Sequence, residues 1–119
     1  WKVPETNSPE VNAAVGMQDY QVNGAIMALQ GAEPAMLIDL LEWQQPRDNA
    51  DPYPNLHRPG LARLALRSSD LHSDYAFLVA EGVDVLSEPA TVMSSANHGS
   101  RFFCFKDPDG TFLELVESF

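Results

Sequence analysis

Cysteine and basic side chains are scarce in this chain, and long apolar runs are missing. The 119 residues include one cysteine, Cys104, so no disulfide can form within the chain, which is compatible with a reducing cytoplasm. There are 7 Lys and Arg against 17 Asp and Glu, so the chain lacks the basic face that nucleic acids and anionic membranes require. No apolar run approaches the ~20 residues of a membrane span. The N-terminus does not resemble a signal peptide. We therefore expect a cytoplasmic protein with neither nucleic acid nor membrane as a partner.

Common catalytic motifs are also absent. The sequence has no Gly-x-Gly-x-x-Gly, Gly-x-x-x-x-Gly-Lys or Gly-x-Ser-x-Gly. Its three histidines, His57, His72 and His98, show no metal-binding spacing, and a solvated surface histidine is the common case. His98 is the best functional candidate because its glycine-containing loop could overhang a pocket. Cys104 lies in an apolar strand-like run and is expected to be a buried core thiol.

One helix is predicted in the second half of the chain. Asp70 offers a side chain that can cap its first turn. Leu71, Tyr75 and Leu78 follow at spacings of four and three residues, which places them on one helical face. Gly82 is a typical helix end.

Strands are predicted on both sides of this helix. Apolar or alternating runs mark residues 61–66, 83–86, 100–105 and 111–117. Asp107–Gly110 is a turn between the last two strands, with a glycine available for positive φ. The predicted order is therefore strand, helix, strand, strand, strand.

The first half of the chain repeats the end of the second half. At a shift of 75 residues, residues 37–42 match residues 112–117 in class at every position. At a shift of 82 residues, residues 1–3 match residues 83–85. The first copy has no counterpart of residues 60–82, so we expect the sequence to lack a strand and a helix, roughly 20 to 25 residues, before it. A naturally shortened first module is the alternative.

The repeat also predicts the domain organisation. Residues 1–45 form a partial first module, and residues 60–119 form a complete second module. Residues 46–59 are rich in Pro, Asn and Asp, which is typical of a linker. Because they join two copies of one unit, we interpret them as a crossover within a single domain of residues 1–119.

The second module resembles the glyoxalase / bleomycin-resistance / extradiol-dioxygenase superfamily, which has the vicinal oxygen chelate fold. The resemblance rests on residues 58–66, on the helix end at Gly82–Val85 and above all on the Asp107–Gly110 turn before an apolar strand with an embedded Glu. The first module is similar to the family's other module through residues 23–29 and 37–43. The resemblance implies an α+β fold of two βαβββ modules that form a curled mixed sheet around one pocket. The first module would lack its first strand and helix.

The resemblance also implies one divalent metal in that pocket, held by His and Glu side chains from both modules. Fe, Zn, Ni or Mn would suit such ligands. Glu114 and Asp39 stand at the family's carboxylate positions and are the candidate metal ligands. The family's histidine position in the second module holds Arg63, whose guanidinium has no lone pair to offer a metal. The metal site is therefore incomplete in this sequence.

Three functions remain open. The first is a metal-dependent lyase, isomerase or dioxygenase acting on a small oxygenated substrate. The second is a metal-free binding or sequestering protein of the bleomycin-resistance type, with Arg63, His98 and Phe103 as candidate ligand-binding residues. Arg63 would then pair with Glu114 or hold an anionic group of the ligand. The third is a structural or regulatory module of a longer chain.

The expected partners follow from the same considerations. A small-molecule ligand is common to the first two functions. Aromatic side chains could line its pocket, namely Tyr20, Trp43, Tyr53, Phe102, Phe103 and Phe105. A homodimer is expected, because the short first module leaves a sheet edge that a second chain would cover.

Overall fold

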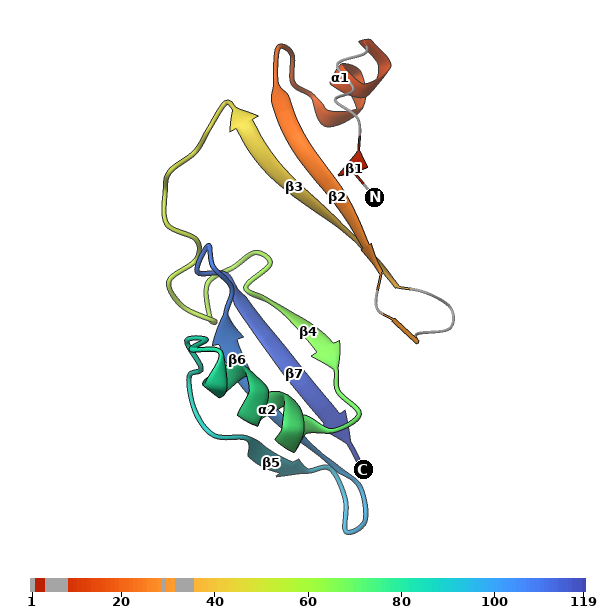
Figure 1. The fold of residues 1–119 in the computed structure, drawn as a ribbon, viewed down its shortest axis with the longest axis vertical. Coiled ribbons are helices and arrows are strands. Elements are labelled where there is room, and N and C mark those ends of the chain that lie inside the picture. Colours follow the sequence, from red (N-terminus) through yellow and green to blue (C-terminus); the bar gives the residue numbers. More distant parts are fainter. Residues whose placement is uncertain (1, 4–8, 29, 32–35) are drawn as a thin grey trace. The chain divides into compact units, whose positions relative to one another are not determined.

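The computed structural model describes residues 2–3, 9–28, 30–31 and 36–119, and the chain divides into two units, residues 1–50 and 51–119. Each unit is described by itself (Figure 1). The elements of the first unit are β1 (Lys2–Val3), α1 (Pro9–Val15), β2 (Gln21–Ala28) and β3 (Leu37–Gln45). The elements of the second unit are β4 (Arg63–Arg67), α2 (Leu71–Ala80), β5 (Ala90–Met93), β6 (Gly99–Lys106) and β7 (Phe112–Ser118). The α+β class is confirmed, and the strands form two sheets, one in each unit.

The first unit is built on an antiparallel sheet in the order β1-β2-β3. Ala25 of β2 pairs with Lys2 on one side and with Leu40 on the other. Tyr20 is buried, and its ring packs against Trp43 with 5.5 Å between the ring centroids. Among the described residues of this unit, β4 and α2 have no counterpart, as the repeat predicts.

The short helix α1 is not predicted from the sequence. Pro9 at its first position and Glu10 in its first turn are typical start signals, and Gly16 follows its last residue with a positive φ of 69°. The repeat aligns this segment with a loop of the second module, and that comparison hides the local helix signals.

The second unit has the strand, helix, strand, strand, strand order that the sequence predicts. Its sheet runs in the order β4-β7-β6-β5, with β4 parallel to β7 and the other pairs antiparallel. The predicted turn at Asp107–Gly110 joins β6 to β7, and Gly110 adopts a φ of 89° that favours glycine. Figure 1 shows α2 lying across one face of this sheet.

The predicted strand at residues 83–86 is wrong in place and extent. This segment makes an isolated bridge, between Val85 and Phe105, whereas the strand β5 forms at Ala90–Met93. Pro89 stands directly before β5, and proline has no amide hydrogen to donate to a strand ladder. The two valines of the segment pack against the core under α2. Their alternation therefore reflects burial and not a continuous strand.

The helix α2 begins and ends as predicted. The Asp70 carboxylate accepts hydrogen bonds from the Ser73 hydroxyl at 2.7 Å and from the Ser73 amide at 3.1 Å. These two bonds lower the pKa of Asp70 below its ordinary value. Gly82, with a φ of 76°, follows the helix.

Within the described residues, no helix is long and apolar enough to cross a membrane.

The core of the second unit lies between α2 and the sheet. Leu71, Phe103 and Phe105 are buried there, and Leu78 packs against them. Tyr75 meets Phe103 edge to face, with 5.3 Å between the ring centroids. The helical face predicted from the spacing of leucine and tyrosine is therefore confirmed.

Replacement of Leu71 tests this core. Leu71 is 2% exposed, so Leu71→Ala should lower the free energy of unfolding by about 2–4 kcal/mol through lost burial and a residual cavity. Phe77 lies on the same helix and is 62% exposed, so Phe77→Ala is the matched control and should change stability by less than about 1 kcal/mol. Urea unfolding of both variants measures the difference. Equal losses would show that α2 is not held by the Leu71 face.

Candidate functional site

The two faces of the second sheet have different characters. Side chains alternate along a strand, and directly paired residues share a face. Phe103 pairs with Leu115, and both lie on the face covered by α2. Cys104 pairs with Glu114, so both point to the opposite face. We call this second surface the helix-free face, defined by Cys104, Glu114 and the residues paired with them.

An ion pair occupies the helix-free face. Nη1 of Arg63 lies 2.9 Å from Oε2 of Glu114. The residue Glu114 is 7% exposed, whereas the Arg63 side chain is 46% exposed. The pairing follows from the register, because Ala65 of β4 stands opposite Glu114 and Arg63 is two residues away on the same face. A buried carboxylate is costly without a partner, and Arg63 supplies that partner.

The thiol of Cys104 completes this cluster. Its Sγ atom lies 3.7 Å from Oε2 of Glu114, as a weak donor to the carboxylate. Burial raises the pKa of the Cys104 thiol, and the negative charge of Glu114 raises it further, while Arg63 acts in the opposite direction. The predicted buried thiol is confirmed, and at neutral pH it is protonated and poorly nucleophilic.

These residues do not fit a divalent metal ion. The carboxylate oxygen that faces Arg63 is already engaged by a guanidinium, which carries a fixed positive charge and cannot act as a ligand. Within the described part of the chain, no three His, Cys, Asp or Glu side chains gather where they could hold a metal. Asp39, the other predicted ligand, lies exposed on β3 of the first unit, opposite Ile26.

The remaining predicted ligand-binding residues lie away from this cluster. His98 stands in the β5–β6 hairpin, where its Nδ1 is 3.2 Å from the Ser95 hydroxyl oxygen. It precedes Cys104 by six residues, about 20 Å along an extended strand. Phe103 is 1% exposed in the core under α2, on the face opposite Glu114. The structure thus brings together Arg63 and Glu114, and it separates both from His98 and Phe103.

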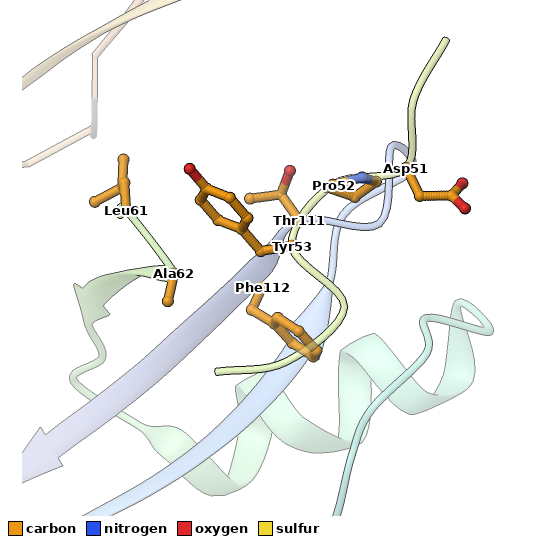
Figure 2. A pocket seen from close by; sticks show the side chains of 7 residues that line it. All are labelled: Asp51, Pro52, Tyr53, Leu61, Ala62, Thr111 and Phe112. Atoms are coloured by element: carbon orange, nitrogen blue, oxygen red, sulfur yellow. The ribbon is translucent and has the colours of Figure 1, made fainter. Parts of the chain in front are cut away.

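A hollow of about 230 Å³ opens in the second unit, between the chain that leads into β4 and the start of β7. Its lining is shown in Figure 2 and consists of Asp51, Pro52, Tyr53, Leu61, Ala62, Thr111 and Phe112. Tyr53 belongs to the aromatic set considered for a pocket from the sequence, but Phe112 does not. The alternation of side chains along the last strand could have identified Phe112. It places Phe112 on the same face as Glu114, two residues later.

Comparisons with known proteins give consistent results. The family model described as the Glyoxalase/Bleomycin resistance protein/Dioxygenase superfamily matches residues 17–115. A glyoxalase family protein from Bacillus cereus has a similar structure, with a TM-score of 0.80, 17% identity, and 99% of this chain and 75% of that chain covered. A glyoxalase family protein from Enterococcus faecalis gives a TM-score of 0.51, 24% identity, and coverage of 98% and 76%. Both likenesses concern the fold. No curated protein matches the chain.

Removal of Arg63 should leave a buried carboxylate without its cation. Because Arg63 is half exposed, we expect Arg63→Ala to lower the free energy of unfolding by about 1–3 kcal/mol, less than for a fully buried pair. The double variant Arg63→Ala/Glu114→Gln should recover part of this loss, since it removes the uncompensated charge. Urea unfolding of the single and double variants measures the coupling. Strictly additive losses would show that the two side chains do not interact.

The Cys104 thiol should make stability depend on alkaline pH. Because its pKa is higher in the folded state, this state holds the proton more tightly than the unfolded state does. The contribution is fully present below the ordinary thiol pKa of ~8.5 and is lost as the pH rises through the folded-state value. The urea midpoint of the wild type should therefore fall relative to that of Cys104→Ala above this pH. A constant difference would contradict the raised pKa, because a cavity left by the substitution gives a pH-independent offset.

Proposed function

Because the chain belongs to the glyoxalase/bleomycin resistance protein/dioxygenase superfamily, we propose that it is a metal-free member that binds a small molecule on the helix-free face. The observation that supports this proposal is the 2.9 Å contact between Arg63 and Glu114. In this contact, the carboxylate that the family resemblance suggests as a metal ligand is engaged in an internal ion pair. The proposal treats residues 1–119 as one domain, with residues 46–59 as its crossover.

The electrostatics of the pair support a site without a metal. A divalent cation ~4 Å from a carboxylate gains about 8 kcal/mol at an effective dielectric constant of ~20, and a guanidinium at the same distance repels it by the same amount. With Arg63 beside Glu114, the two terms nearly cancel, and little remains to offset the loss of the ion's hydration.

The pair also supports binding of a small molecule. A guanidinium has five N–H donors in one plane, and a single ion pair leaves most of them for other acceptors. The side chain of Arg63 is 46% exposed, so these donors are accessible. Phe112, which stands opposite Arg63 in the register, adds an apolar ring to the same face. An apolar surface with a few fixed polar groups is typical of small-molecule sites.

The proposal includes a cytoplasmic homodimer. In the order β1-β2-β3, the strand β3 pairs with β2 on one side, and no strand within the described residues pairs with its other edge. Leu37 and Leu40 of this strand are 62% and 55% exposed. An open, apolar edge strand invites pairing with another chain, and a second copy would provide it.

Metal content is the direct test of this function. Native mass spectrometry of the wild type, purified without chelator or His tag, should show protein without stoichiometric Fe, Zn, Ni or Mn, even after these ions are added. Arg63→His replaces the guanidinium with a metal-binding imidazole beside Glu114 and Cys104, and it should take up Zn²⁺. Arg63→Leu, which removes the charge without adding a ligand, is the control and should take up less.

A metal found in the wild type would contradict the proposal. One equivalent of metal in the wild type, lost in Glu114→Ala, would overturn the metal-free proposal. It would favour a metal-dependent lyase, isomerase or dioxygenase. The same spectra report the mass of the assembly, so a monomer at micromolar concentration would contradict the dimer.

A further inference from the structure

The hollow beside β4 and β7 has the size of a single-ring ligand. Its volume is about 230 Å³, and an apolar protein cavity of ~150 Å³ can hold benzene. Tyr53, Leu61 and Phe112 contribute its apolar walls, and Thr111 adds a hydroxyl. Figure 2 shows the Asp51 carboxylate directed away from Tyr53 and Leu61. All lining residues belong to the second unit, so the hollow is complete within it.

The Tyr53 wall is held by close contacts. A Cβ atom placed on Gly60 would lie 2.6 Å from the Tyr53 hydroxyl oxygen, so the ring fits only because residue 60 has no side chain. The guanidinium of Arg58 lies 5.2 Å from the centroid of the same ring, within cation–π range. Pro52 precedes Tyr53 in the sequence and also lines the hollow. A Cβ atom placed on Gly110 would lie 3.2 Å from Cγ of Pro52. The first two contacts lie within the segment before β4, and the third brings this segment to the β6–β7 turn.

Arg63 stands at the edge of this hollow. It follows the lining residue Ala62 directly and pairs in register with the lining residue Phe112. Its guanidinium reaches Glu114, two residues beyond Phe112 on the same face, which is about 7 Å along the strand. A ring in the hollow with a short polar substituent would therefore place that substituent near the N–H donors of Arg63.

The charges around Arg63 favour an uncharged substituent. Glu114 already neutralises the guanidinium, so an anionic ligand would meet a second carboxylate beside the same cation. The formal net charge of −10 also opposes an anion. Two cations lie beside the walls of the hollow: Lys106 is paired with Asp84 at 3.2 Å, and Arg58 lies over the Tyr53 ring. A carbonyl oxygen meets neither repulsion, and it accepts hydrogen bonds from N–H groups.

On the basis of the proposed function, we infer that the ligand is a small, uncharged aromatic carbonyl compound. Its ring occupies the hollow between Tyr53, Leu61 and Phe112. Its carbonyl oxygen accepts a hydrogen bond from the guanidinium of Arg63, while Glu114 holds the guanidinium in place. Arg63 thus acts as a hydrogen-bond donor to a neutral acceptor and not as the binding site of an anion.

Three probes of similar size separate these contributions. Acetophenone has the ring and the carbonyl, ethylbenzene has the ring alone, and benzoate has the ring and a negative charge. In ¹H–¹⁵N NMR titrations of the full chain, acetophenone should shift the amide signals of Ala62, Thr111 and Phe112. Ethylbenzene should shift the same signals and bind about tenfold more weakly, the loss expected for one hydrogen bond to a charged donor. Benzoate should bind more weakly than acetophenone.

Variants show which residues bind the ring of the ligand and which bind its carbonyl group. Tyr53→Ala should weaken both acetophenone and ethylbenzene, whereas Leu56→Ala, a change in the same segment outside the lining, should weaken neither. Arg63→Met/Glu114→Gln keeps the length of both side chains and removes both charges. In this variant acetophenone should lose its advantage over ethylbenzene.

Three results would overturn the inference: tightest binding by benzoate, no shift of the lining amides with any probe, or an unchanged acetophenone affinity in Tyr53→Ala. Each is independent of metal content. A metal-free protein that does not bind acetophenone in the hollow would contradict the ligand class and leave the proposed function standing. A stoichiometric metal in the wild type would contradict the proposed function first.

Discussion

The buried carboxylate of Glu114 is the constraint on which the second unit depends. At 7% exposure it requires a cation, and Arg63 meets that requirement from the neighbouring parallel strand. The pair forms in a register of β4 on β7 that places Ala65 opposite Glu114 and Arg63 two residues away on the same face. A slip by one residue would turn Arg63 toward the face packed by α2 and leave the carboxylate alone. The ion pair therefore joins β4 to β7 and also sets the charge distribution on the helix-free face.

Much of the second unit can be predicted from local signals. The cap at Asp70, the Leu71 face and the turn at Gly110 each depend on residues close in sequence, and all three are confirmed. Alternation along the last strand, together with the family resemblance, predicts that Arg63 and Glu114 meet. The pairing of the last two strands also explains why Phe103 lies apart from Arg63 and Glu114. Its partner Leu115 lies on the face opposite to that of Glu114.

The parts that the sequence does not predict depend on contacts between distant residues. The segment at 83–86 alternates like a strand, but its valines are partly buried and pack against the core under α2, while the ladder forms at Ala90–Met93. The wall of the hollow requires Tyr53 to lie over Gly60, a contact that neither linker composition nor periodicity encodes. Composition describes residues 46–59 as a connection, and only the folded chain shows that part of this connection lines a surface.

The two partners of the ion pair differ in exposure, so the helix-free face presents the cation to its surroundings and buries the carboxylate. Glu114 is buried and receives donors from two strands, the guanidinium of Arg63 and the weakly donating thiol of Cys104. The Arg63 side chain is 46% exposed, and a guanidinium with one ion pair keeps further N–H donors. An exchangeable metal ion in its place would offer open coordination positions and Lewis acidity, whereas a guanidinium offers directed hydrogen bonds. Arg63 beside the buried Glu114 carboxylate thus presents directed N–H donors on this face.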